Sequence, residues 1–281
     1  MAKVWPVHYA LGVAGVALIR NWMAGDDAAK ARVDELISLT RRLTEDPSLN
    51  FQLDIPDMEV ESGYALWADT YDNFPNPLIN VEEPIIRALL ERMPAGRALD
   101  AACGTGRYTR YMRARGHEVE AVDVSRAMIA QARVSSPEVR FSVGSLEALP
   151  FTDGSFDLVM CGLALTHLPQ ISPAIVELAR VLKPGGWAIL ADHHPVAGLL
   201  GGSAIFQDKD RFFRNVTSFR HGHAEYISAF VAAGLEIQEC FEPEMTEEQA
   251  AIGPLFGIAP NAFRAGVVGV PMALIWLLRR R

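Results

Sequence analysis

The spacing of apolar residues changes once along the chain, close to residue 60. Over 27–45, apolar residues such as Leu36 recur at helical intervals between charged ones, and 7–23 is also predicted to be helical. Pro47 ends the second helix, and a linker is expected from there to about residue 61. We therefore expect 1–60 to form an N-terminal helical extension. Because an amphipathic helix needs an apolar partner, its inner face should pack against a segment elsewhere in the chain.

Short apolar runs alternate with helical segments from residue 97 onward. The runs predict strands at 97–101, 118–122, 139–143, 156–161 and 187–191. Helices are predicted between them at 107–114, 125–133 and 172–182, the last ended by Lys183-Pro184-Gly185-Gly186. A helix at 224–233 and strands at 235–242 and 271–278 complete the edge. This alternation is typical of βαβ units, so we expect an α/β fold with a Rossmann-like, doubly wound and mostly parallel sheet.

Composition and charge narrow the class of protein. The chain is 50% hydrophobic and 21% charged, as a folded globular chain should be. A net charge of -8 without a long Lys/Arg cluster argues against nucleic acid as a partner. Three widely spaced cysteines fit a reducing compartment, so the cytoplasm is the expected location. The apolar stretches 9–19 and 265–278 are shorter than the roughly 20 residues that span a bilayer, so no membrane insertion is expected.

A glycine-containing loop follows the first strand of the predicted sheet and opens the next helix. It reads Asp100-Ala101-Ala102-Cys103-Gly104-Thr105-Gly106. Gly104 and Gly106 allow a sharp turn and a close approach of the backbone to a ligand. In a doubly wound sheet, such a loop lies at the carboxyl ends of the strands, where ligands bind.

Residues around this loop argue against a ligand that contains phosphate. Thr109 stands where a dinucleotide-binding loop has its third glycine, and no Gly-Lys-Ser/Thr follows. Asp123 ends the second strand, where its carboxylate can accept hydrogen bonds from both hydroxyls of a ribose. Asp100 is suited to an α-ammonium group, directly or through water or backbone amides. A ribose and an ammonium without phosphate together predict S-adenosyl-L-methionine as the cofactor.

Five sequence segments, in order, resemble the class I S-adenosylmethionine-dependent methyltransferase superfamily, in its small-molecule (type 11-like) branch. They are LDAACGTG, EVEAVD, VGSLEALPF before DGSFDLV, CGLALTHL and LKPGG. The resemblance covers roughly residues 64–280. It implies a methyltransferase domain over 61–281, with a seven-stranded sheet whose last strand is antiparallel.

The resemblance also implies a set of cofactor-binding residues. Gly104 and Gly106 would line the methionine part, beside Ala102 and Cys103, and Asp123 would hold the ribose. The other implied contacts are Val124 and Met128 flanking the adenine, Gly144, Ser145 and Leu146 at its edge, and Cys161, Gly162 and Leu163 beside the cofactor. The family often has a third glycine where Ala102 stands and commonly an aspartate where Ser145 stands. We expect a hydroxyl or a backbone carbonyl to meet the adenine amino group instead.

Two segments are expected to enclose the methyl acceptor. Residues 64–72 resemble the entry segment of the same family, which folds over the cofactor as a lid. Within it, Tyr71 is the stronger candidate to face the sulfonium, whose positive charge favours aromatic faces. Simple packing of Trp67 and Tyr71 against the sheet explains these aromatic residues equally well. Residues 195–223, rich in glycine and phenylalanine, are expected to form an insertion that covers the acceptor.

Three histidines just past the ends of strands are candidate catalytic bases. His167 follows the fourth strand of the sheet, and His193 and His194 follow the fifth. Histidine titrates near neutral pH, which suits it to proton transfer. A structural hydrogen bond is the competing explanation for each of the three.

The sequence does not predict a metal site. His221 and His223 lack a nearby set of cysteines or carboxylates, and such pairs are more often surface residues. The acidic run 242–248 is expected to be a solvated face rather than a set of catalytic carboxylates.

The leading hypothesis is an enzyme that transfers a methyl group to O, N or C of a small, fairly apolar organic molecule. An enzyme that uses the same cofactor for cyclisation or decarboxylation is the nearest alternative. A nicotinamide-dependent oxidoreductase would need the glycine that Thr109 replaces. A non-catalytic binding protein is a further alternative, with the N-terminal helices as its partner surface. Those helices could instead form the interface of a homodimer.

Overall fold

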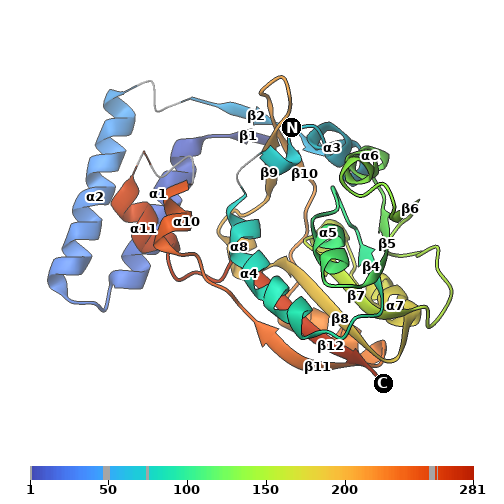
Figure 1. Cartoon of the computed structure of the whole chain (residues 1–281). Coiled ribbons are helices and arrows are strands. Elements are labelled where there is room, and N and C mark those ends of the chain that lie inside the picture. Colours follow the sequence, from blue (N-terminus) through green and yellow to red (C-terminus); the bar gives the residue numbers. More distant parts are fainter. Residues whose placement is uncertain (1, 47–50, 74–75, 253–256, 258) are drawn as a thin grey trace.

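A seven-stranded sheet with helices on both faces forms the larger of two lobes, and a smaller lobe of helices lies beside it (Figure 1). The structure is a computed structural model that describes residues 2–46, 51–73, 76–252, 257 and 259–281. The strands run in the order β11-β12-β8-β7-β4-β5-β6. Their bounds are β4 Arg97–Ala101, β5 Glu118–Asp123, β6 Arg140–Val143, β7 Phe156–Gly162, β8 Leu182–His193, β11 Leu235–Phe241 and β12 Ala273–Arg280.

The direction of the strands confirms the predicted fold class. Strand β4 is parallel to β5 and β7, and the pairs β5–β6 and β7–β8 are also parallel. Strand β12 is antiparallel to both of its neighbours, β8 and β11. The chain is therefore α/β, with a Rossmann-like, doubly wound, mostly parallel seven-stranded sheet whose last strand is antiparallel. Ala101 lies opposite Val122 and Cys161, so the carboxyl ends of the central strands meet at one edge.

Helices cover both faces of the sheet because successive strand residues point to opposite sides. On β8, Leu190 belongs to the core beneath α7 and α9, whereas its neighbour Ile189 belongs to the core beneath α4 and α5. Helix α6 packs along β5 and β6. These helices are α4 Pro77–Arg92, α5 Arg107–Ala114, α6 Arg126–Ser135, α7 Ser172–Val181 and α9 His223–Ala232.

Helix α4 is an element that the sequence pattern does not predict. Pro84 lies inside it, and an internal proline normally ends or kinks a helix because it removes a backbone hydrogen bond. The start is well defined, since the Asn76 side chain accepts a hydrogen bond from the Leu78 amide at 3.0 Å. The face that carries Ile86 and Leu89 is buried against the sheet, and this burial outweighs the break in the hydrogen-bond ladder.

The insertion at 195–223 folds together with the segment that precedes the lid. It contains α8 (Pro195–Leu199), β9 (Ala204–Gln207) and β10 (Phe213–Val216). Strand β10 pairs with β9 and also with β3 (Asp57–Met58), in the stretch where a linker was expected. Helix α3 (Val60–Trp67) packs on β10. The contact is tight, because a Cβ at Gly63 would lie 2.9 Å from Cγ2 of Val216.

The smaller lobe is built from two distant parts of the chain. Helices α1 and α2 pack against each other, and α1 packs against α11, so α11 supplies the partner that the N-terminal helices require. A Cβ at Gly266 would lie 2.7 Å from the Val13 carbonyl oxygen, which shows how closely α1 and α11 approach. Strand β1 pairs with β2. The bounds are β1 Ala2–Val4, α1 Pro6–Asn21, α2 Asp26–Glu45, β2 Leu53–Ile55, α10 Glu247–Ile252 and α11 Pro260–Val267.

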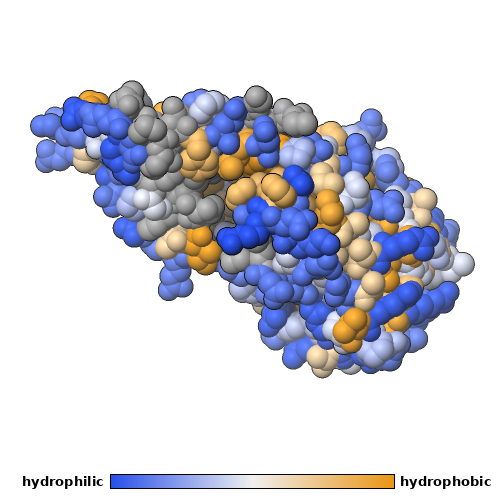
Figure 2. Space-filling model, turned by 90° about the horizontal axis from the view of Figure 1, so that it is seen from above, coloured by the Kyte–Doolittle hydropathy of each residue, from blue (hydrophilic) through white to orange (hydrophobic). Residues whose placement is uncertain are grey.

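The hydropathy of the surface and the positions of the two apolar stretches, 9–19 and 265–278, agree with this packing. Seen from above, hydrophilic residues cover most of the face, with apolar residues near its middle (Figure 2). The stretch 9–19 lies in α1, and 265–278 divides between α11 and β12. Within the described part of the chain, no helix combines the length and the hydropathy that crossing a bilayer requires.

Candidate active site

A cavity opens at the carboxyl ends of β4, β5 and β7, where the topology predicts a ligand site. We call it the cofactor cavity. Many of the expected cofactor-binding residues line it: Tyr71, Ala102, Gly104, Asp123, Val124, Gly144, Ser145, Leu146, Gly162 and Leu163. Five other expected residues, Asp100, Cys103, Gly106, Met128 and Cys161, lie outside its lining. Their contact with a cofactor stays a prediction.

Left-handed backbone shapes the loop after β4. Ala102, Gly104 and Gly106 have φ values of 59°, 55° and 84°. At Gly104 a Cβ would meet nothing within 4 Å, so this side of the loop is open to a ligand. At Gly106 a Cβ would lie 3.3 Å from the Ala132 side chain, so this glycine serves the packing of α5 against α6. The conformation of Ala102 explains why a glycine is suited to that position.

Asp123 joins the tip of β5 to this loop. One carboxylate oxygen accepts a hydrogen bond from the Gly104 amide and the other accepts one from the Ser125 amide, each at 2.8 Å. Burial raises the pKa of the Asp123 carboxyl, and these backbone hydrogen bonds oppose that rise. A carboxylate oxygen can accept two hydrogen bonds, so each retains capacity toward the cavity that Asp123 lines.

Asp100 is placed differently from Asp123. Its carboxylate is buried beneath the loop and accepts a hydrogen bond from the Thr109 hydroxyl at 2.6 Å. Burial raises the pKa of Asp100 to about 6. Asp100 therefore anchors the first turn of α5. Thr109, which replaces the third glycine of a dinucleotide-binding loop, is its partner.

The lid covers the cofactor cavity with aromatic rings. It consists of α3 and the 3-10 turn η2 (Tyr71–Asn73). Trp67 stacks on Phe206 of the insertion, with ring centroids 4.6 Å apart. The hydroxyl of Thr105, in the loop after β4, donates a hydrogen bond to Asp72 at 2.8 Å. The lid is thus attached both to the insertion and to the cofactor loop. Burial raises the pKa of Tyr71 to about 12, so its ring stays neutral.

A second cavity adjoins the first beneath the insertion. We call it the acceptor cavity. It shares four residues with the cofactor cavity: Tyr64, Tyr71, Leu163 and His167. Leu163 stands at the end of β7 with φ 57°, a strained value for a branched residue, and strain of this kind often marks functional sites. The rest of the lining is mainly apolar and includes Trp67, Leu78, Ile205, Met245 and Met272.

His167 lies in the wall between the two cavities, at the end of the 3-10 turn η3 (Leu165–His167). Its Nδ1 atom is 2.8 Å from the Thr217 carbonyl oxygen, which can only accept, so Nδ1 carries a proton. In the neutral ring, Nε2 then accepts a hydrogen bond from the Tyr64 hydroxyl at 2.8 Å. Burial lowers the pKa of His167, which favours this neutral form.

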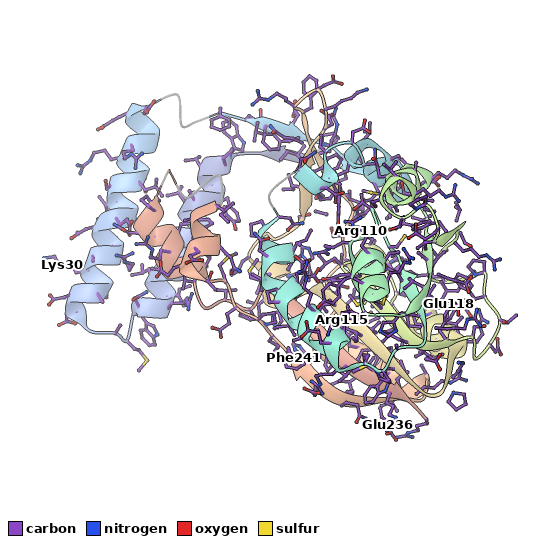
Figure 3. All side chains as sticks on the ribbon, viewed as in Figure 1. Lys30, Arg110, Arg115, Glu118, Glu236 and Phe241 are labelled. Carbon is purple, nitrogen blue, oxygen red and sulfur yellow. The ribbon has the colours of Figure 1, made fainter. Side chains whose placement is uncertain are left out.

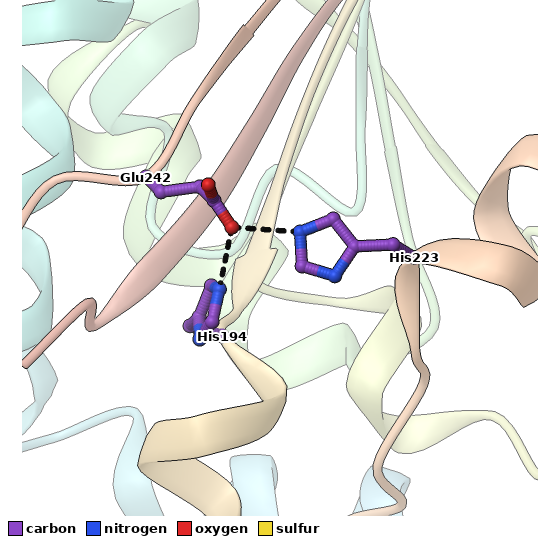
Figure 4. A group of neighbouring side chains, drawn as sticks. All are labelled: His194, His223 and Glu242. Carbon is purple, nitrogen blue, oxygen red and sulfur yellow. Dashed lines mark hydrogen bonds and ion pairs between the residues drawn. The ribbon is translucent and has the colours of Figure 1, made fainter.

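The two other candidate bases differ from each other. His193 lines the acceptor cavity, and burial lowers its pKa to about 4. His194 points to Glu242, whose Oε1 atom also contacts His223, at 2.9 Å and 2.7 Å respectively (Figure 4). This group, which we call the stem cluster, joins the residues that flank the insertion. His221 lies apart from it and bonds Glu225 and the Leu168 carbonyl.

The stem cluster has the composition of a three-ligand metal site, and its ligand atoms lie within 4.8 Å of one another. Nδ1 of His194 accepts a hydrogen bond from the Val196 amide at 3.2 Å, so the proton of the neutral ring is on Nε2. A metal at Nε2 would require the opposite tautomer, with a proton facing that amide. The geometry therefore matches a hydrogen-bonded cluster. Glu242 is exposed, as expected of the run 242–248, although its carboxylate also bonds the two histidines.

Several residues of the two cavities were not singled out from the sequence. Tyr64 was recognised only as part of the lid segment, and Met245 lies inside the acidic run. Met272 precedes β12, and Leu78 lies in the first turn of the unpredicted helix α4. Only Tyr64 had a local signal, the tyrosine that begins the lid motif. The other three reach the acceptor cavity through tertiary packing.

Comparisons with known proteins agree with the fold and the loop. A family model described as a methyltransferase domain matches residues 99–190. Malonyl-[acyl-carrier protein] O-methyltransferase of Enterobacter lignolyticus is 41% identical over 102 residues, 35% of this chain and 41% of that protein. Demethylmenaquinone methyltransferase of Renibacterium salmoninarum is 36% identical over 107 residues, 38% of this chain and 45% of that protein. The chain spans less than half the length of these curated relatives.

A solved structure shows the same fold. The S-adenosylmethionine-dependent methyltransferase from Mesorhizobium loti superposes with a TM-score of 0.55 and 22% identity, over 71% of this chain and 98% of that one. At this identity the likeness concerns the fold.

The cofactor cavity suits the cofactor of this family, S-adenosylmethionine. Asp123 offers acceptors for a ribose, and Gly104 leaves room for the backbone to approach the ligand. Among the described residues that line this cavity there is no lysine or arginine, in keeping with a ligand that lacks phosphate. The motifs, the strand order and the matched relatives agree on a class I S-adenosylmethionine-dependent methyltransferase domain of the type 11 branch, matched over residues 99–190.

Proposed function

We propose that this chain transfers a methyl group from S-adenosylmethionine to O, N or C of a small, fairly apolar organic molecule. The observation that carries the proposal is the pair of adjoining cavities. The first is lined by the loop after β4 and by Asp123, and the second is mainly apolar. Their shared wall of Tyr64, Tyr71, Leu163 and His167 is where a cofactor and an acceptor would meet.

The residues of the two cavities would act mainly by positioning and by excluding water. When bound, S-adenosylmethionine supplies an activated methyl group on a positively charged sulfur. Asp123 and the Gly104 backbone would fix the nucleoside and the methionine part, while the neutral rings of Tyr64 and Tyr71, which line the cavity, would offer π electrons to the positive charge. The lid, attached to the insertion and to the cofactor loop, would keep bulk water from the reacting atoms. Such positioning accounts for much of the rate of a direct displacement.

The apolar acceptor cavity favours one kind of acceptor over another. One relative is named for a malonyl group on an acyl carrier protein and another for demethylmenaquinone. A malonyl group carries a free carboxylate, and among the described residues of the acceptor cavity there is no arginine or lysine to pair with it. An unpaired carboxylate is costly to bury. We therefore propose a small neutral molecule rather than a malonyl carrier protein.

Binding and product analysis test the proposal. The purified chain is titrated with S-adenosylhomocysteine and, in parallel, with NAD by calorimetry. It is then incubated with methyl-labelled cofactor and candidate acceptors. We expect binding of S-adenosylhomocysteine only, and label in an acceptor product. Binding without any transferred label would favour cyclisation or decarboxylation, whereas binding of NAD alone would favour an oxidoreductase.

A further inference from the structure

We propose that the acceptor cavity binds a neutral molecule with a weakly acidic O–H group, a phenol or an enol, and that Tyr64 and His167 relay its proton to His167 Nε2. The inference rests on the proposed function and specifies the acceptor of that same site. It also assigns to Tyr64 a catalytic part that the sequence did not indicate.

Two consecutive hydrogen bonds connect the groups of the relay. The Tyr64 hydroxyl donates to His167 Nε2, and the protonated Nδ1 of the same ring donates to the Thr217 carbonyl, both at 2.8 Å. A base whose second nitrogen is held by a fixed acceptor keeps one tautomer and one orientation. Thr217 directly follows β10, so the insertion that covers the acceptor also orients the base.

The position of Tyr64 matches the place where an acceptor hydroxyl would arrive. Tyr64 lines both cavities. Its ring is fixed by stacking on Trp67, with centroids 5.6 Å apart, so the relay needs no movement of the lid. The phenolic oxygen donates one hydrogen bond to His167 and can still accept one from an acceptor hydroxyl.

The proton balance of the transfer follows this line. The O–H bond of the acceptor breaks, its proton passes to the Tyr64 oxygen, and the Tyr64 proton passes to His167 Nε2. The electron pair left on the acceptor oxygen forms the bond to the methyl carbon. The bond between that carbon and sulfur breaks, and its electrons stay on sulfur, which becomes neutral. The imidazolium then shares its Nδ1 proton with the Thr217 carbonyl and later releases the extra proton to solvent.

The groups around His167 favour a neutral acceptor over other nucleophiles. Its titratable neighbours are Tyr64 from α3, Tyr71 from η2 and His193 from β8, while Asp123 and Asp192 act on Tyr64 from farther away. No cationic side chain among the described residues lines either cavity, so a carboxylate would lack a partner. A carboxylate or a neutral amine also has a lone pair ready to react and would not require a relay.

A photoacid provides a direct test. The acceptor cavity is titrated with 2-naphthol and with 2-naphthoate, a size-matched carboxylate, in the presence of saturating S-adenosylhomocysteine. The 2-naphthol is excited at a wavelength longer than those that tryptophan absorbs. In the excited state, bound 2-naphthol releases its proton only where a proton acceptor lies within hydrogen-bond reach. We expect 2-naphthol to bind at least ten times more tightly than 2-naphthoate and to emit as the naphtholate. In Tyr64→Phe and His167→Gln, bound 2-naphthol should emit as the neutral form.

Tyr111→Phe is the matched control, because Tyr111 bonds Glu91 on the surface and lies outside both cavities. It should leave the emission and the affinity unchanged. Equal affinity for 2-naphthoate, or naphtholate emission that persists in Tyr64→Phe, would overturn the inference. A chain that fails to bind S-adenosylhomocysteine would instead refute the proposed function, so the two failures are distinguishable.

Discussion

Asp123 and Asp100 are two buried carboxylates near the loop after β4, and their hydrogen-bond partners give them different roles. Asp123 accepts from two backbone amides and lines the cofactor cavity, whereas Asp100 faces Thr109 beneath the loop. The same exchange of Asp for Asn therefore has a different expected effect at each position.

Asp123→Asn should weaken binding of S-adenosylhomocysteine by about 1 to 3 kcal/mol, because the amide has one acceptor atom fewer and no charge. Calorimetric titration measures the affinity. Asp157→Asn is the control, since Asp157 bonds Lys183 and the Arg97 amide and does not line the cavity. An unchanged affinity in Asp123→Asn would show that the ribose is held elsewhere.

Asp100→Asn should change how stability depends on pH. In the folded chain the pKa of Asp100 is raised from 3.8 to about 6, so the folded state holds a proton that the unfolded state releases between these values. The contribution of this carboxyl to stability is therefore present below pH 3.8 and lost as the pH rises through 6. Relative to the natural chain, Asp100→Asn should gain roughly 1 to 3 kcal/mol between pH 4 and pH 7.

Urea unfolding at pH 4 and at pH 7 checks this difference. His193 titrates in the same window, with its pKa lowered to about 4, and loses its contribution as the pH falls. It is present in both chains, so its effect cancels in the comparison. A difference in stability that does not vary with pH would contradict the expectation.

At the scale of residues, the sequence predicted the positions of candidate site residues that have a local sequence motif. The glycines after β4 and the acid that ends β5 were found because loop and strand place them by spacing alone. The hydrogen bond between Tyr64 and His167 was not found, because 103 positions separate these residues and only packing brings them together. The sequence offered His193 and His194 as equivalent, but one faces the acceptor cavity and the other faces Glu242.

Glu242 is one of the points at which the insertion is attached to the larger lobe. It directly follows β11 and contacts one histidine at each end of the insertion. Glu242→Ala would leave the buried His194 Nε2 without its acceptor, at a cost of about 1 to 3 kcal/mol for that group. We expect faster amide hydrogen exchange over 195–222, with little change in β4 and β5.

Glu236→Ala is the control for this exchange experiment. Glu236 lies on β11, the strand that Glu242 follows, at the lower end of the larger lobe, where it pairs with Arg281 (Figure 3). Its loss should leave the insertion unchanged. Equal protection of 195–222 in both variants would mean that the stem cluster does not hold the insertion.

At the scale of elements, the strands and helices of the sheet were predicted well because buried parallel strands form short, continuous apolar runs. The limits of β4 and α5 agree with the prediction. Helix α4 was missed because Pro84 interrupts its pattern. Strands β9 and β10 were missed because they are short and pair outside the main sheet.

The contact between α1 and α11 holds the smaller lobe together. Gly266→Ala would place a Cβ 2.7 Å from the Val13 carbonyl oxygen, a backbone atom that cannot move aside easily. We expect a loss of about 1 to 3 kcal/mol from this overpacking, seen as easier proteolysis of α1 and α2. Gly12→Ala is the matched control, because a Cβ there meets nothing within 4 Å. It should stabilise α1 by roughly 0.5 to 1 kcal/mol. The same sign in both variants would contradict this account.

At the scale of the molecule, the sequence predicted that the N-terminal helices need a partner but not where it lies. The answer, α11, is about 240 residues away in the chain, and no local pattern encodes such a contact. The division into 1–60 and 61–281 remains a proposal about the chain. In space, the smaller lobe combines the N-terminal helices with α10 and α11, whereas the chain ends in β12 of the main sheet (Figure 1).

The place of β12 between β8 and β11 sets the order in which a new chain can fold. While the ribosome is still adding residues before 273, β8 and β11 have an open edge facing each other, with unpaired amides and carbonyls. The apolar residues of β8 that will later be covered stay available to other chains during that time. The gap is filled only once β12 can pair with both strands, so this edge of the sheet is completed after residues 273–280 have left the ribosome.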